Sequence, residues 1–300
     1  MKRRVGFGAF PRALAAGLQW KLLLLWFVFT LIPALVAARP LHAMLAGLMD
    51  HSVHADAWAR HFNGLAMTDT IVNVMRHGGL ALGAAAGLGL ILTLLLAPFL
   101  TGMSVVAVRS AHRPGFGELM HGGLHEYWRL FRFMIWGFGL MGFAFGLGGL
   151  AMAVASRHAK EVVLQSQADL GNHLAMLTMV VLLVLAHSMV EAGRGQIVAD
   201  AGLRSATTAF FRGMATLFRR PLSTLGMYLG VTVIGFIVWG LLGFWRTHLV
   251  AASWGGYALA FVATLLIVAA MAWMRTARLA AFGAVAHACM RSTSVTVAPA

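Results

Sequence analysis

The chain has 300 residues, of which 60% are apolar and only 11% are charged. Soluble domains contain about 45–50% apolar and about 25% charged residues, and a water-soluble fold of this length cannot hide so much apolar surface. The net charge of +14 would suit nucleic acid, but the basic residues punctuate apolar runs and build no basic face. The composition therefore predicts an all-α integral membrane protein with the lipid bilayer, and no nucleic acid, as its partner.

Six uncharged apolar runs are long enough to cross a hydrocarbon core about 30 Å thick as helices. They cover residues 22–38, 78–108, 133–156, 174–190, 221–245 and 249–274. We therefore expect an amphipathic N-terminal segment over 1–21, a six-span membrane domain over 22–276 and a C-terminal tail over 277–300.

The loops between these runs predict the orientation. If the N-terminus is cytoplasmic, 17 of the 23 Lys and Arg residues share the cytoplasmic side and six lie opposite. The positive-inside rule describes such a bias. We expect a multi-pass protein of a bacterial-type inner (plasma) membrane with both termini in the cytoplasm.

Amphipathic stretches precede three of the runs. On a helix at about 100° per residue, one arc before the third run collects the polar side chains of Glu118, His121, His125, Arg129 and Arg132. Before the fifth run, Arg204, Arg212 and Arg219 lie opposite Phe210, Phe211 and Phe218, and residues 10–21 form a poorer version before the first run. These patterns predict three repeats of an amphipathic helix followed by a two-span hairpin.

The basic faces of these helices suit anionic phospholipid head groups or a membrane protein partner. The residues we expect to make that contact are Arg129, Arg132, Arg212, Arg219 and Arg220. The alternative interpretation is that the helices only lead the chain into the membrane.

Glycines recur at helical spacing in two of the runs. Gly139, Gly142, Gly146 and Gly149 share one face of the third run, and Gly79, Gly83 and Gly87 share one face of the second. Small residues let helices approach closely in lipid. We expect tight packing within the chain, with a dimer face or a substrate path as the alternatives.

A polar cluster follows the fourth run. His187, Glu191, Arg194, Asp200 and Arg204 recur at spacings that place partners three or four residues apart on a helix. We predict an interfacial salt-bridge cluster that fixes the exit of the helix, including a pair between Asp200 and Arg204. Ionisable groups near a bundle interior also allow a proton or substrate relay.

The layout of repeated amphipathic helix and hairpin, with Glu191-Ala-Gly-Arg194 and Asp200-Ala-Gly-Leu-Arg204 leading from a span into the next helix, resembles a known architecture. It is similar to the poly-helical membrane domain of bacterial glycerophosphoryl diester phosphodiesterases and related uncharacterised six-span proteins. The resemblance implies a membrane module. The chain has no room for the soluble catalytic domain of those enzymes, so their hydrolytic activity is not carried over.

The largest external loop contains a group of metal-ligating residue types: Asp50, His51, His54 and His61. Imidazole and carboxylate together suit zinc, nickel or copper, although no HExxH pattern or cysteine ligand accompanies them. A small-solute or metal-ion transporter with this capture site is one alternative function.

No phosphate loop, nucleophile elbow or facing pair of haem ligands occurs in the sequence. We therefore expect no cofactor and no enzymatic activity, and predict a membrane module or transport-associated subunit. The second alternative, an intramembrane lipid-modifying enzyme, would need a reactive set such as Glu118, His121 and His125.

Overall fold

The computed structural model describes residues 9–49, 64–162, 164–249 and 253–294, and within them the chain is all α-helix with no strand. The helices are α1 (Ala9–Ala16), α2 (Trp20–Met49), α4 (Gly64–Arg109), α5 (Phe116–Glu161), α6 (Gln165–Ala199), α7 (Ala206–Arg219), α8 (Pro221–Thr247) and α9 (Trp254–Ser294).

Six of these helices, α2, α4, α5, α6, α8 and α9, are long and apolar enough to cross a membrane. Helices satisfy every backbone hydrogen bond internally, which lipid requires of a spanning segment. The prediction of a six-span helical membrane protein is confirmed. Each helix is longer than the uncharged run that predicted it, because helices continue into the polar interface where charged residues are tolerated.

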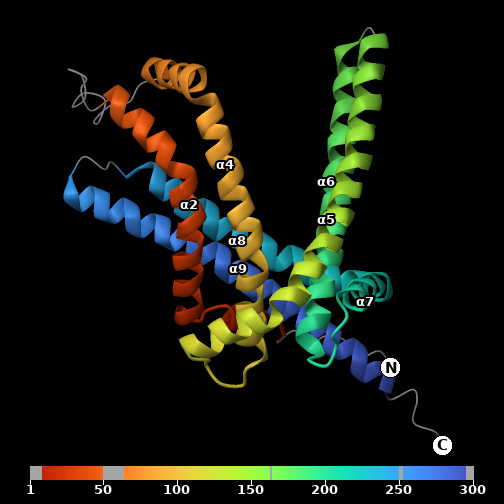
Figure 1. The fold of residues 1–300 in the computed structure, drawn as a ribbon. Coiled ribbons are helices and arrows are strands. Elements are labelled where there is room, and N and C mark those ends of the chain that lie inside the picture. Colours follow the sequence, from red (N-terminus) through yellow and green to blue (C-terminus); the bar gives the residue numbers. More distant parts are fainter. Residues whose placement is uncertain (1–8, 50–63, 163, 250–252, 295–300) are drawn as a thin grey trace, which may run out of the picture.

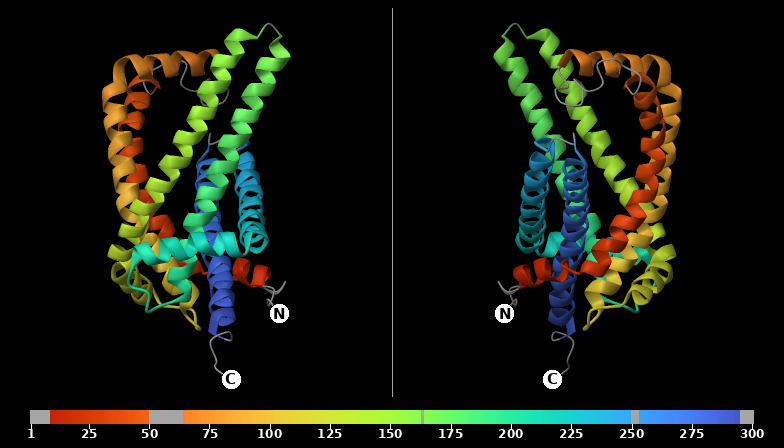
Figure 2. Two further views of the ribbon diagram at one scale, coloured as in Figure 1. Left: turned by 90° about the vertical axis from the view of Figure 1, so that its right-hand side faces the viewer. Right: turned by 90° about the vertical axis from the view of Figure 1, so that its left-hand side faces the viewer.

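The six long helices form three hairpins, α2 with α4, α5 with α6, and α8 with α9. The hairpins converge at one end and splay apart toward the other (Figures 1 and 2). We call the converging end, where α1, α7, the first half of α5 and the end of α9 lie, the base. The buried apolar clusters gather there, whereas large side chains such as Phe143 and Leu177 on the splayed α5–α6 hairpin are exposed.

A short amphipathic segment precedes each hairpin and packs on the second helix of another hairpin. The first half of α5 contacts α4, α7 contacts α6, and α1 contacts α9. These contacts link the hairpins in a closed cyclic order. The predicted layout is present, with one correction: the second amphipathic segment is not a separate helix, because α5 runs without a break from Phe116 to Glu161.

Small residues make two of these contacts very close. A Cβ on Gly102 of α4 would lie 3.0 Å from the Cα of Gly123 in α5, and a Cβ on Gly213 of α7 would overlap the backbone of Gly193 in α6. In the third contact, Ala13 of α1 is buried in one cluster with alanines of α9.

The glycine faces noted in the sequence do not make these contacts. A Cβ on any of Gly139, Gly142, Gly146, Gly149, Gly79, Gly83 or Gly87 would meet no atom within 4 Å. The prediction of tight packing within the chain is therefore wrong for these faces. Gly148 instead turns toward Met179 of α6, because the hairpin partner occupies a different side of α5.

The segment predicted as the C-terminal tail begins inside a helix. Residues 277–294 continue α9 as a helix, and Ala277, Leu279, Phe282 and Val285 are buried. The charged residues Arg275 and Arg278 interrupt the hydropathy of this segment but do not end the helix.

Replacing Gly213 by alanine should destabilise the protein by about 1–3 kcal/mol, because the added methyl group overpacks the backbone contact with Gly193. Thermal or denaturant unfolding of the detergent-solubilised protein measures the effect. Gly142→Ala is the matched control, since its Cβ enters open space. Equal stability of the two variants would contradict the cyclic packing.

Candidate functional site

The base carries most of the basic side chains that the structure describes, on α1, α7, the first half of α5, the basal ends of α2, α4, α6 and α9, and the segments that join α6, α7 and α8. Their arrangement divides into three groups: an ion-pair cluster between α4 and α5, a pocket between α5 and α7, and a polar centre where the hairpins meet. Each group combines a different set of elements and has different chemistry.

In the first group, the buried Glu126 of α5 lies between two arginines. Its Oε1 is 2.9 Å from Nη1 of Arg109 in α4, and its other oxygen pairs with Arg129 one helical turn away. Arg109 also donates to the carbonyl oxygens of Ile197 and Val198 at the end of α6. The cluster therefore joins three helices at a point where the last carbonyl groups of α6 need donors.

Arg129 also donates to the carbonyl oxygen of Leu203, at 2.7 Å, and its side chain is only 11% exposed. The guanidinium of Arg129 thus contacts Glu126 and the loop after α6, while its Nε has no hydrogen-bond partner among the described residues. The lipid contact predicted for this residue stays a prediction.

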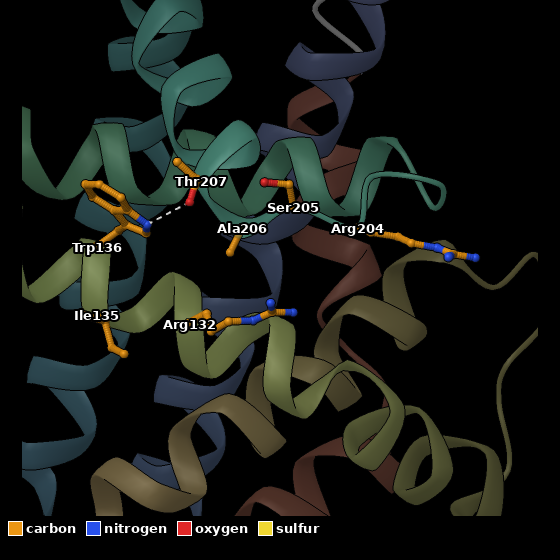
Figure 3. A pocket seen from close by; sticks show the side chains of 7 residues that line it. All are labelled: Arg132, Ile135, Trp136, Arg204, Ser205, Ala206 and Thr207. Carbon is orange, nitrogen blue, oxygen red and sulfur yellow. Dashed lines mark hydrogen bonds between the residues drawn. The ribbon is translucent and has the colours of Figure 1, made fainter.

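The second group is an open pocket of about 580 Å³ between α5 and α7. Arg132, Ile135 and Trp136 of α5 face the start of α7, and Trp136 Nε1 donates to the hydroxyl of Thr207 at 3.1 Å (Figure 3). Arg204 and Ser205 complete the lining, with Arg204 extending outward.

The pocket favours a negatively charged ligand. Ser205 is the N-cap of α7 and accepts from the backbone N–H of Thr208. Because Ser205 also lines the pocket, the partial positive charge of the first turn of α7 lies at the pocket wall. Arg132 and Arg204 add two full positive charges. Of the residues that the structure describes around the pocket, none of the lining side chains is acidic.

Helix α7 lies crosswise to the hairpins (Figure 2). One of its faces packs on the bundle and the other is exposed, as in an interfacial helix. Phe210 and Leu217 are buried against the bundle, whereas Phe211 and Phe218 are exposed. Arg212 and Arg219 are exposed on the same helix, and Arg220 is the residue between α7 and α8. The lipid contact predicted for these three arginines stays a prediction.

In the third group, the structure brings His187, Glu191 and Arg194 of α6 together. Arg194 Nη1 is 2.8 Å from Oε1 of Glu191, and His187 Nε2 is 3.6 Å from the same oxygen. His187 Nδ1 lies 2.7 Å from the hydroxyl of Tyr228 in α8. The carboxylate is buried, so these partners supply the pairing that an ionised group needs inside a bundle.

A small cavity of about 20 Å³ adjoins this cluster and is lined by all three hairpins. Trp26 comes from α2, Thr101 and Ser104 from α4, Glu191 and Arg194 from α6, and Arg275 and Leu279 from α9. The guanidinium of Arg275 lies 5.5 Å from the ring centroid of Trp26, close enough for a cation–π contact.

The predicted pair between Asp200 and Arg204 does not form. Helix α6 ends at Ala199, so the helical spacing that would have joined the two residues is lost. Asp200 accepts from the backbone N–H of Gly202 and lies 3.5 Å from Arg212, and Arg204 lines the pocket between α5 and α7. The predicted cluster of five residues is thus split between two places.

The predicted metal ligands Asp50, His51, His54 and His61 lie outside the described residues. In the part of the chain that the structure does describe, no three His, Cys, Asp or Glu side chains come together to hold a metal ion.

The set considered for a lipid-modifying enzyme lies at the start of α5. Glu118 accepts from the backbone N–H of Gly115 at 2.9 Å and lies 3.4 Å from His112. His121 and His125 are exposed on the following turns. Glu118 thus serves the N-terminal cap of α5.

Sequence reasoning missed Glu126 as the centre of an ion-pair cluster, and missed Arg275 and Arg278 as part of the polar centre. The i, i+3 spacing of Glu126 and Arg129 and of Arg275 and Arg278 was visible in the sequence. The contact of Glu126 with Arg109, across a loop, was not.

We compared the chain with protein-family models, curated proteins and solved structures, and none of them matches it.

Glu126→Ala should cost about 3 kcal/mol of stability, because it leaves Arg109 and Arg129 without their shared carboxylate. Chemical unfolding in detergent measures the loss. Glu161→Ala, at the exposed C-terminal end of the same helix, should change stability little. A loss for Glu161→Ala as large as that for Glu126→Ala would show that the cluster does not join the helices.

Proposed function

We propose that this protein is a non-enzymatic membrane module that binds the phosphate of an anionic phospholipid head group in the pocket between α5 and α7. The observation that carries the proposal is that Arg132, Arg204 and the first turn of α7 line one open pocket. Guanidinium groups and helix N-termini both donate hydrogen bonds to phosphate oxygens.

The surroundings of the pocket support a lipid as the source of that phosphate. Ile135 and Trp136 are exposed beside the two arginines, and Phe211 is exposed on α7 with its ring 5.7 Å from that of Trp136. A phosphate site next to exposed apolar rings matches the boundary between head groups and acyl chains, where tryptophan is favoured.

The proposal includes an orientation, with the base on the cytoplasmic side of a bacterial-type inner membrane. The 17-to-6 division of basic residues supports it. The cytoplasmic leaflet also supplies the anionic lipids that a basic pocket attracts. The likeness to phosphodiesterase membrane domains is compatible with such a module, and a protein partner at the base is a further part of the proposal.

Arg132→Gln with Arg204→Gln should weaken binding of phosphatidylglycerol about 30-fold, because each arginine near an anionic surface contributes about 1 kcal/mol. Native mass spectrometry of the delipidated protein, titrated with phosphatidylglycerol or phosphatidylcholine, measures the change in affinity for each lipid. Phosphatidylcholine carries the same phosphate but no net charge, so its binding should be weaker and should change less.

The matched control removes two basic residues from the opposite end of α5, with Arg157→Gln and Lys160→Gln. This variant should bind phosphatidylglycerol as the wild type does. Equal losses in the two double variants would show that general charge, and not the pocket, attracts the lipid.

The orientation makes a separate prediction. Green fluorescent protein fused after Ser294 should fluoresce, and alkaline phosphatase fused after Leu164, between α5 and α6, should be active. An active phosphatase fused at Gly202, between α6 and α7, would place the base outside the cell and overturn the proposal.

A further inference from the structure

The two arginines of the pocket between α5 and α7 are held apart by the elements that carry them. Arg132 lies on α5, and Arg204 belongs to the segment before α7. Figure 3 shows the guanidinium of Arg132 beside the first turn of α7, whereas Arg204 extends away from that turn. The two guanidinium groups thus line the same pocket but do not converge on one position.

Both arginines keep hydrogen-bond donors for a ligand. The Nε of Arg132 donates to the carbonyl oxygen of Trp128, at 3.3 Å, and this leaves its two terminal nitrogens for other acceptors. Arg204 is exposed and has no hydrogen-bond or ion-pair partner among the described residues. A guanidinium binds phosphate through two parallel N–H groups, so each of the two arginines is able to hold a phosphate of its own.

A phospholipid with a single phosphate uses only part of this arrangement. Its phosphate pairs directly with one guanidinium, and the other guanidinium attracts it only at longer range, where dissolved ions screen the interaction. A phosphate monoester carries more charge but still concentrates that charge at one position. The separation of Arg132 from Arg204 therefore favours a head group that contains two separate phosphates.

The exposed apolar surface beside the pocket also extends in two directions. Along α5, Ile135 and Phe138 are exposed one helical turn apart. On α7, which lies crosswise to the hairpins (Figure 2), Phe211 and Phe218 are exposed two turns apart on one face. One pair of acyl chains covers one such strip, whereas two strips along crossing helices suit a lipid with two pairs of chains.

We propose that the pocket between α5 and α7 binds cardiolipin, with one of its phosphates on Arg132 and the other on Arg204. Cardiolipin consists of two phosphatidyl groups joined through one glycerol, so it has two separate phosphates and two pairs of acyl chains. Basic pockets on the cytoplasmic side of membrane proteins bind its head group. This inference rests on the proposed function, since it names the lipid that the same pocket takes.

The test compares three lipids on the delipidated, detergent-solubilised full chain by native mass spectrometry. Phosphatidylglycerol offers one singly charged phosphate, phosphatidic acid offers one phosphate of higher charge, and cardiolipin offers two phosphates. We expect one cardiolipin per chain, bound about fivefold or more tightly than either of the other lipids, because a second pair of phosphate and arginine adds about this factor near a membrane surface. Phosphatidic acid that binds as tightly as cardiolipin would overturn the proposal, since total charge would then account for the affinity.

Single variants show whether both arginines are needed. Arg132→Gln and Arg204→Gln should each lower the ratio of cardiolipin affinity to phosphatidylglycerol affinity about fivefold, because each variant leaves one phosphate of cardiolipin unpaired. Arg12→Gln removes an exposed arginine of α1, at the base but outside the pocket, and should leave the ratio unchanged. A cardiolipin preference that survives both pocket variants would show that its additional acyl chains cause it, and the proposal would be wrong.

The outcomes separate this inference from the proposed function. If cardiolipin and phosphatidylglycerol bind equally well and the double variant of Arg132→Gln with Arg204→Gln weakens both, the pocket binds anionic phospholipid in general and only the choice of cardiolipin is overturned. If none of the pocket variants weakens the binding of either lipid, the proposed function fails as well.

Discussion

The close contact between each amphipathic segment and the second helix of another hairpin holds this fold together. Lipid tails are as apolar as leucine, so the hydrophobic effect does not drive helices together inside a bilayer. Backbone approach at Gly102 with Gly123, and at Gly193 with Gly213, provides dense packing in its place. The contact of α1 with α9 completes the cyclic order of the three hairpins. The hairpins are therefore joined to one another at the base.

The same contacts bring many positive charges close together at the base. The segments that pack there are basic, and bringing them together concentrates guanidinium groups around few carboxylates. Glu126 compensates the charges of Arg109 and Arg129, and Arg109 also donates to a carbonyl oxygen at the end of α6. Positive charge without a carboxylate partner remains in the pocket between α5 and α7, and this pocket therefore has a reason to bind an anion.

Local patterns in the sequence predicted much of this structure. Uninterrupted apolar runs located six spans, and spacings of three and four residues brought His187, Glu191 and Arg194 together, because both depend only on neighbours along one helix. The pair of Asp200 with Arg204 failed because the helix ends at Ala199. The partners of Asp200 and Glu126 depend on loops and on helix crossings that spacing does not encode.

The glycine faces also show that spacing along one helix does not identify the partner helix. Periodicity correctly placed Gly139, Gly142, Gly146 and Gly149 on one face of α5, but it carries no information on which side of α5 the partner helix lies. The glycines that make close contacts, such as Gly123 and Gly213, lie in the amphipathic segments, where hydropathy drew attention to arginine instead.

The proposed lipid pocket lies where α5 and α7 meet, and this position would have a thermodynamic consequence. A ligand that contacts α5 and α7 together binds only when these elements are packed against each other. Binding and packing would then be linked, so a bound lipid would stabilise the contact between α5 and α7 by its own binding free energy.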